Sequence, residues 1–313
     1  MSGNHSFKGK LTSFAIVCVI ATTTLACGCS NKIKRAELLC DEGMQRLNEN
    51  CLDEARAKFQ EALKCSPRCL PAYVGIGEIE LRSQRFAEAK DAFDQALKFD
   101  SRFIAARRGR GEAYLGLKEY QAALDDLNVA LEVDPNQTAL LSHRVYAYVN
   151  LGRLDEALED SNKCVANSPT DPAYYVNRGL LRQKRGEFDQ ALADLTQAIS
   201  LEEYNPMNYA LRGKVYESSG NWDAALEDYN KALSIDSTCY SAYRNRGNYF
   251  MGLGRWDDAV IDLSRAIELN PNDARVYFER ASAYRQLGDK EKEQADLKEV
   301  ERLDPTYLTG AEQ

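Results

Sequence analysis

Residues 240–273 read YSAYRNRGNYFMGLGRWDDAVIDLSRAIELNPND, and this stretch carries the pattern that decides the fold. With Tyr240 as position 1, positions 4, 7, 8 and 11 share one face of a helix, and positions 20, 23, 24, 27 and 28 share one face of a second helix. A polar turn, LGRW, separates the two helices, and NPN ends the second one. The stretch therefore predicts a pair of helices joined by a short turn.

The same motif recurs at a shift of 34 residues from Ala36 to Tyr307, without insertion or deletion. Glycine is the commonest residue at position 8 and alanine at positions 20 and 27, and five copies have a proline at position 32. A helical pair of this size is too small to bury its own apolar face, so the copies must stack on one another. We therefore predict an all-α solenoid of eight repeats. The repeats span 36–69, 70–103, 104–137, 138–171, 172–205, 206–239, 240–273 and 274–307.

The period and the residue pattern resemble the tetratricopeptide repeat (TPR) family over residues 36–307, and the resemblance implies a right-handed α-solenoid. In that family, positions 2, 5, 9, 12 and 13 of the first helices line a concave groove that takes an extended peptide or a partner helix. The residues at these positions vary between copies, as expected for partner-binding residues, although drift of solvent-exposed residues would give the same variation. The groove residues that the resemblance implies are Arg108, Glu112, Ser142, Tyr146, Val176, Leu180, Gln183, Lys214, Arg244, Asn248, Met251, Arg275 and Phe278.

Two charged positions change together between copies. Position 7 is arginine and position 23 is aspartate in copies 3 to 8, whereas copy 1 has the reversed charges Glu42 and Lys58, and copy 2 has Ile76 and Ala92. Both positions lie on the inward faces of their helices, so this co-variation predicts a two-hydrogen-bond ion pair inside each repeat. The predicted structural pairs are Arg110 with Asp126, Arg144 with Asp160, Arg178 with Asp194, Arg212 with Asp228, Arg246 with Asp262, and Arg280 with Asp296.

The last copy differs at positions where earlier copies pack against a successor. Position 17 becomes Lys290 and position 20 becomes Glu293. The second helix of this copy is therefore predicted to be a solubilising C-terminal cap, since terminal repeats need a polar outer face. Residues 308–313 are predicted to be a frayed tail.

The N-terminal segment 1–26 differs from the repeats. Two lysines precede an uncharged, largely apolar run over 11–26, which is the layout of a secretory signal. A small residue directly before a cysteine, as at Cys27 and Cys29, resembles the lipobox of bacterial lipoproteins, and the resemblance implies lipid attachment at one of the two. An uncleaved anchor and an ordinary cleaved signal are the alternatives. With a lipid or an anchor, residues 27–35 form a tether, and the repeats face the periplasm or exterior of a bacterial cell envelope.

Four cysteines cluster in the first repeat: Cys40, Cys51, Cys65 and Cys69. In an oxidising compartment they could form two disulfides, with three connectivities that the sequence does not separate. Free buried thiols are the second interpretation. A metal site is the third, although the spacing lacks the close cysteine pairs of zinc sites and no histidine is near. Cys164 occupies an alanine position and is predicted to be a core residue.

The remaining sequence offers little for catalysis. The formal net charge of −8 argues against nucleic acid as a partner. His143 is the only histidine after the N-terminal segment, and no phosphate-binding glycine motif is present, so we expect no catalytic site, no cofactor and no metal. We predict a non-catalytic protein-interaction scaffold. The alternative is a structural lipoprotein subunit of a secretion, pilus or polysaccharide-export machine.

Overall fold

The computed structural model describes residues 27–310, and the side chains at 27–30 and 309–310 are outside that description. The predicted targeting segment 1–26 and the last three residues of the predicted tail lie outside the described part of the chain. All regular elements within residues 27–310 are helices. They are α1 (Cys27–Asn48), α2 (Leu52–Cys65), α3 (Leu70–Arg82), α4 (Phe86–Phe99), α5 (Ile104–Gly116), α6 (Tyr120–Val133), α7 (Thr138–Asn150), α8 (Leu154–Asn167), α9 (Pro172–Lys184), α10 (Phe188–Leu201), α11 (Pro206–Ser218), α12 (Trp222–Ile235), α13 (Tyr240–Gly252), α14 (Trp256–Leu269), α15 (Ala274–Leu287), α16 (Lys290–Leu303) and α17 (Tyr307–Gly310).

The repeat boundaries read from the sequence coincide with helix boundaries. Copies 2 to 8 each begin at the first residue of an odd-numbered helix, from Leu70 of α3 to Ala274 of α15. The first repeat differs, because α1 begins at Cys27 and the predicted tether 27–35 is helical and continuous with it. No proline interrupts this stretch, and Ala36 and Leu39 continue an apolar stripe that packs in the core. The first helix of the solenoid is therefore longer than the repeat pattern predicts.

A left-handed residue makes the turn inside every repeat, at position 15. In repeats 4 to 8 this residue is a glycine, with φ between 71° and 82°. In repeats 1 to 3 it is Asn50, Gln84 or Lys118, with φ of 61°, 56° and 62°. Glycine adopts this conformation at no steric cost, whereas a side chain makes it unfavourable. The first three turns are therefore built with less suitable residues than the last five.

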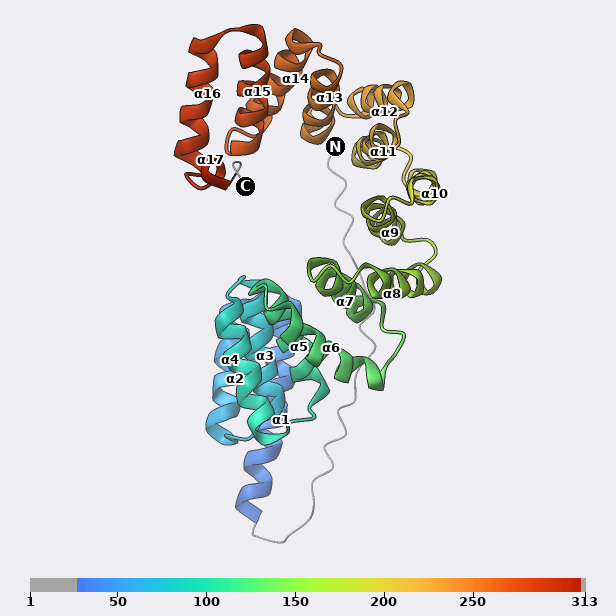
Figure 1. Cartoon of the computed structure of the whole chain (residues 1–313). Helices are drawn as coiled ribbons and strands as arrows, with labels where there is room; N and C mark the ends of the chain where they lie inside the picture. Colours follow the sequence, from blue (N-terminus) through green and yellow to red (C-terminus); the bar gives the residue numbers. More distant parts are fainter. Residues whose placement is uncertain (1–26, 311–313) are drawn as a thin grey trace.

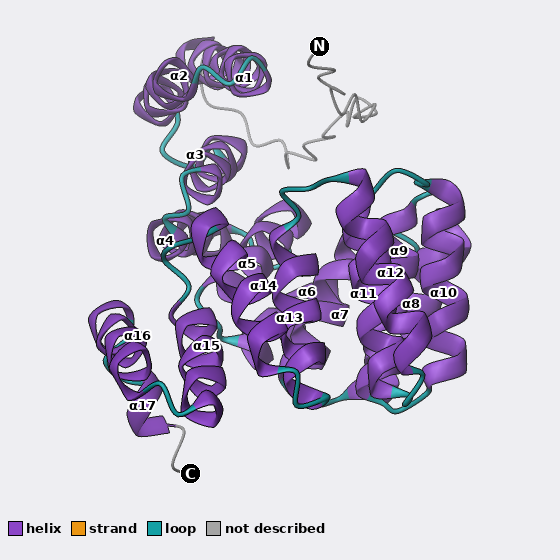
Figure 2. Ribbon diagram, turned by 90° about the horizontal axis from the view of Figure 1, so that it is seen from above, coloured by secondary structure: helices purple, strands orange, loops and turns teal. Residues whose placement is uncertain are grey.

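The repeats follow one another around an open arc, with α7, α9, α11 and α13 on its inner side and α8, α10 and α12 outside (Figure 1). Successive odd-numbered helices touch along much of this inner layer, as α3 touches α5 and α11 touches α13. The view from above keeps α1 and α2 apart from α15 and α16, so the two ends of the solenoid do not close on each other (Figure 2). The inner layer is therefore a curved surface made by the first helix of each repeat.

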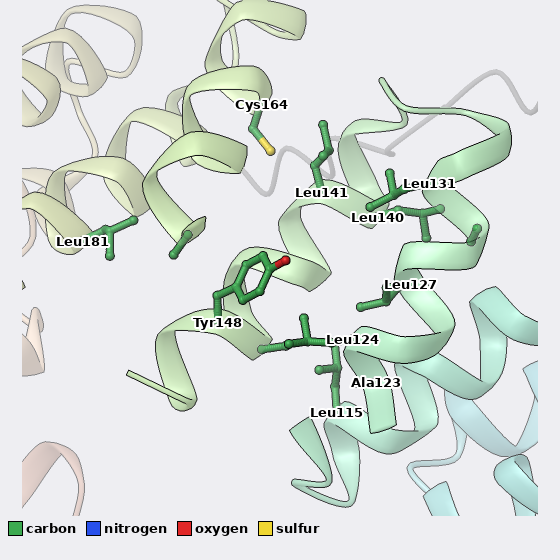
Figure 3. Packing of buried hydrophobic residues seen from close by; sticks show 13 residues of the cluster. Leu115, Ala123, Leu124, Leu127, Leu131, Leu140, Leu141, Tyr148, Cys164 and Leu181 are labelled. Atoms are coloured by element: carbon green, nitrogen blue, oxygen red, sulfur yellow. The ribbon is translucent and has the colours of Figure 1, made fainter. Parts of the chain in front are cut away.

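The core runs between the two layers and crosses from repeat to repeat. One buried cluster joins Leu124 of α6, Leu141 and Tyr148 of α7, Cys164 of α8 and Leu181 of α9 (Figure 3). Cys164 is 2% exposed at a position that is alanine in six other repeats, which confirms its prediction as a core residue. Each repeat thus buries its apolar residues both between its own two helices and against its neighbours.

Phenylalanine fills the repeat interface in the first two repeats. Phe93 of α4 is fully buried, and its ring lies between Gly77 of α3 and Gly109 of α5. A Cβ atom would lie 2.5 Å from the ring Cζ if added to Gly77, and 2.3 Å if added to Gly109. Phe59 is placed in the same way against Gly75. The two large rings therefore require glycine on the helix that follows.

The C-terminal end is closed by a polar helix and one packed ring. In α16, Lys290 is exposed and Glu293 pairs with Arg285 at 2.6 Å, as suits a helix with no successor. Tyr307 begins the short α17, and its ring lies edge-on to Phe278 with 5.5 Å between the centroids. Residues 308–310, the first part of the predicted frayed tail, continue this helix.

Candidate functional site

All six predicted arginine–aspartate pairs are present. In each, the guanidinium Nε and Nη2 donate to the two carboxylate oxygens, with nitrogen–oxygen distances of 2.6–3.0 Å. The aspartates are at most 5% exposed, and hydrogen bonding to Asp262 raises the pKa of Arg246. Such bidentate pairs hold the two helices of a repeat in a fixed geometry.

Each of these arginines also has a third partner that the sequence analysis missed. The remaining nitrogen, Nη1, donates to position 25 of the preceding repeat, for example from Arg246 to the Asn230 side-chain oxygen at 2.6 Å. The acceptors in order are Asp94, Asn128, Asn162, Thr196, Asn230 and Ser264. We call each set of three residues a strut. The sequence signal was a small polar residue with a side-chain oxygen at position 25 of copies 2 to 7.

The first two repeats are held together differently. Lys58 donates to Glu42 at 2.6 Å, so copy 1 has the predicted pair with reversed charges. Copy 2 has no strut arginine, and Glu80 of α3 takes over the contact between repeats. Its carboxylate accepts hydrogen bonds from Arg56 of α2 and, at 2.5 Å, from Arg85. Glu80 is 5% exposed, so its carboxylate is buried at the interface of repeats 1 and 2, whereas the Arg85 side chain is half exposed.

The thirteen groove residues all lie on odd-numbered helices, and none of them is buried. Several contact the next odd-numbered helix, which places them on the side where these helices approach each other. Arg244 of α13 forms two hydrogen bonds with Glu279 of α15, and Gln183 of α9 donates to the Ser218 hydroxyl of α11 at 3.0 Å. We call the surface formed by the thirteen residues and Met207 the inner face.

Some of these residues are committed to contacts within the chain. Arg244 is held by Glu279, and Arg108 lies 3.5 Å from Glu78, whose pKa is raised by burial. Lys214 pairs with a glutamate of its own helix, and Phe278 packs against Tyr307. Met251 packs against two buried clusters. These residues shape the inner face but offer few free groups to a partner.

Other inner-face residues remain available. Among the described side chains, Glu112, Ser142, Asn248 and Arg275 make no hydrogen bond or ion pair. Tyr146 is 52% exposed. The rest of the exposed apolar surface comes from Val176 and Leu180, which are partly exposed, and from Met207, which is 41% exposed and was missed by the sequence analysis. Met207 occupies position 2 of its repeat, one of the family's groove positions, so the pattern could have identified it.

The four clustered cysteines are free thiols in the structure. Cys40 and Cys69 lie together, with 3.2 Å between their sulfurs. Cys51 precedes α2 and Cys65 ends it, so about 20 Å of helix separates them. They cannot bond to each other, and a two-disulfide set that keeps Cys40 with Cys69 cannot form.

The other sequence candidates fall into two groups. Nδ1 of His143 is buried without a hydrogen-bond partner, and the described residues contain no cluster of three or more side chains that could hold a metal ion. Cys27 and Cys29 lie in the first turns of α1, but their side chains are outside the description. No described helix is both long enough and apolar enough to span a bilayer.

The geometry defines a solenoid of helical hairpins whose first helices form a curved inner layer, which is the class of helical repeat proteins. Tetratricopeptide repeat profiles match residues 40–102, 76–138, 108–172, 172–205 and 274–307, and a TPR repeat profile matches 213–254 and 247–288. The chain belongs to the tetratricopeptide repeat family. A search of curated proteins finds no match.

Solved structures share the fold at low sequence identity. A tetratricopeptide repeat protein from Parabacteroides merdae has a TM-score of 0.64 and 20% identity, covering 80% of this chain and 99% of that one. A chain of the APC/C hetero-tetramer Cut9–Hcn1 has a TM-score of 0.58 and 16% identity, covering 89% of this chain and 55% of that one. YrrB, described as a TPR protein with an unusual peptide-binding site, has a TM-score of 0.52 and 22% identity, covering 59% and 95%.

Proposed function

We propose that this chain is a non-catalytic scaffold that binds a segment of another protein, an extended peptide or a helix, along its inner face. The observation that carries the proposal is the exposed apolar surface at Tyr146 and Met207, next to hydrogen-bonding groups without partners. The arginines and aspartates that recur in the repeats, in contrast, pair with each other in the struts. YrrB, a similar fold, is described as binding a peptide, and Cut9–Hcn1 is an assembly of chains, which supports the same use here.

The chemistry of the inner face indicates an amphipathic partner. Tyr146, Val176, Leu180 and Met207 lie in repeats 4 to 6 and present apolar surface. Asn248 and other free polar groups lie on either side of them along the solenoid. A protein segment with an apolar centre and hydrogen-bonding flanks would match both parts, since interfaces combine apolar anchors with polar rims. A highly charged ligand would match neither.

We further propose that the N-terminal segment tethers this scaffold to a bacterial cell envelope, with the repeats facing the periplasm or the exterior. The support is the layout of residues 1–26 and the cysteines that follow. A lipid on Cys27 or Cys29, or an uncleaved anchor, would serve as the tether. Intact mass measurement of the protein purified from membranes tests this, because a diacylglyceryl group, an uncleaved N-terminus and a plain cleaved N-terminus differ in mass. The plain cleaved form in the soluble fraction would refute the tether.

The binding proposal is tested by crosslinking the native protein in its membrane and identifying partners by mass spectrometry. The decisive comparison uses Tyr146→Ser on the inner face and Tyr204→Ser in the loop after α10, where Tyr204 is 77% exposed. The substitution is identical, so only its place differs. We expect Tyr146→Ser to weaken partner binding by about tenfold or more, as loss of an interface anchor does, and Tyr204→Ser to leave it unchanged.

The outcome also separates the two function classes. Several soluble partners lost in Tyr146→Ser would support the scaffold. A single membrane complex retained in both variants would favour the alternative, a subunit of an envelope machine, and would refute binding through the inner face. Phe278 and Arg244 are less suitable targets, because Phe278 packs on Tyr307 and Arg244 pairs with Glu279.

A further inference from the structure

We propose that Cys40 and Cys69 are a disulfide-forming site that, under oxidising conditions, ties α1 to the last residue of repeat 1, directly before the first helix of repeat 2. The two sulfurs are 3.2 Å apart and joined by a hydrogen bond, although 29 residues separate the cysteines in the chain. A disulfide needs about 2.05 Å, so closure requires a movement of only about 1 Å. This inference is independent of both the inner face and the proposed tether.

The position of the pair explains what the bond would do. Cys40 lies in α1, and Cys69 directly precedes α3, so the bond would tie α1 to the residue before the first helix of repeat 2. Both residues belong to one buried cluster that includes Leu39 and Ala72. This is also the interface where the strut is missing, because copy 2 has Ile76 in place of the strut arginine. The disulfide would add a covalent tie where the repeated ion pair is absent.

The two thiols are suited to different steps of thiol–disulfide exchange. The hydrogen bond with Cys40 lowers the pKa of Cys69, against the effect of burial, and the backbone N–H of Ala72 adds to this lowering. The same hydrogen bond, together with burial, raises the pKa of Cys40. Cys69 is also the more exposed of the two, at 9% against 4%. Cys69 therefore supplies the attacking thiolate.

The exchange balances with a disulfide as oxidant, either oxidised glutathione or a protein disulfide of an oxidoreductase. The Cys69 thiolate attacks one sulfur of the oxidant, forms a mixed disulfide and releases one thiolate. Cys40 then loses its proton and attacks the Cys69 sulfur, which forms the Cys40–Cys69 bond and releases the second thiolate. Two cysteine thiols are oxidised, and one oxidant disulfide is reduced to two thiols.

Another repeat provides a matched control. Cys239 precedes α13 at the same repeat position as Cys69, but the position equivalent to Cys40 is Ala210. Ala210 and Cys239 lie in one buried cluster, and Cys239 is a free thiol. The repeat geometry thus predicts that Cys239 stays reduced in the natural chain. It also predicts that Ala210→Cys creates a second disulfide-forming site.

The test uses the full-length protein, reduced and then incubated with oxidised glutathione. Alkylation, proteolysis without reductant and mass spectrometry should show a peptide linking Cys40 to Cys69 and a mass loss of about 2 Da. Cys51, Cys65 and Cys239 should form no disulfide within the chain and should be recovered either alkylated or bound to glutathione. Cys40→Ala should lack the linked peptide and leave Cys69 bound to glutathione.

Hydrogen exchange supplies a second measurement on the natural sequence, so the test does not depend on a variant that folds. We expect amides of α1 to α3 to exchange at least about tenfold more slowly after oxidation, and amides of α13 to α16 to be unchanged. Ala210→Cys should add a link to Cys239. The proposal is overturned if Cys40 and Cys69 both stay alkylatable, if either bonds to Cys51 or Cys65, or if oxidation leaves α1 to α3 unprotected.

Discussion

The packing of Phe93 between two glycines makes a quantitative prediction for Gly109→Ala. The added Cβ would lie 2.3, 2.4 and 2.8 Å from three ring atoms, against 3.4–4 Å for an ordinary contact, so the ring must move by about 1 Å. It is fully buried and has Gly77 on its other side. Overpacking of this kind costs about 1–3 kcal/mol, and the better helix propensity of alanine returns about 1 kcal/mol. We expect a net loss of up to about 2 kcal/mol, measured by urea unfolding.

The cause of this loss can be isolated with a double mutant. Other repeats have leucine in place of Phe93 and a larger residue in place of Gly109, for example Leu127 with His143. In a Phe93→Leu background, Gly109→Ala should therefore become neutral or stabilising by up to about 1 kcal/mol. Gly111→Ala, on the same helix, should cost less than Gly109→Ala, because its added Cβ would lie 3.1 Å from the nearest atom, Cγ of Leu127. An equal loss in both backgrounds would refute the account of Phe93 packing.

Three further predictions concern stability. Asp262→Ala leaves the Arg246 guanidinium without its buried partner and should cost about 3 kcal/mol in urea unfolding. Asp258→Ala, which removes an exposed ion pair from the same helix, should cost less than about 0.5 kcal/mol. Equal effects would contradict a structural role for the strut. Lys118→Gly relieves a φ of 62° and should stabilise the chain by about 0.5 kcal/mol in the same assay, and a loss would contradict the strain. Burial acts to raise the pKa of Glu80, but hydrogen bonds from Arg56 and Arg85 outweigh this effect and hold the pKa below 4.5. The ionised carboxylate therefore stabilises the fold fully above pH 4.5, and this stabilisation is lost as the pH falls below that value. Glu80→Gln should flatten the loss of stability in acid, and an unchanged acid titration would contradict the ion pair.

The sequence predicted the repeat frame because each requirement recurs at a fixed period. The position of Arg246 and its partner Asp262 followed from co-variation between copies, which acts as an alignment inside one chain. The third strut partner, Asn230, was not predicted, because several residue types can occupy its position. Any small side chain with an oxygen can accept the hydrogen bond from the arginine. A pattern that tolerates substitution leaves a weak signal.

The inner face was only partly predictable. Repeat position identified the face, since Tyr146 and Asn248 lie on inner helices and neither is buried. The pairing of Arg244 with Glu279 depends on how far two successive helices approach each other, which residue spacing does not specify. The closeness of Cys40 and Cys69 likewise comes from the stacking of repeats. The repeat pattern predicted contacts within a repeat, but it did not predict how residues of successive helices meet when the repeats stack.

The struts also carry a consequence for how this chain can change in length. Each interior arginine, such as Arg246, finds one partner 16 residues before it and another 16 residues after it. Removing or duplicating a whole 34-residue unit among repeats 3 to 7 would bring an equivalent donor to equivalent acceptors, so every hydrogen bond of the struts would re-form. The two ends are excluded from this exchange, because Gln60 and Lys298 occupy the acceptor position there. The struts alone therefore allow middle units to be gained or lost, whereas the Phe93 ring, which requires Gly109 on the next helix, keeps repeat 3 directly after repeat 2.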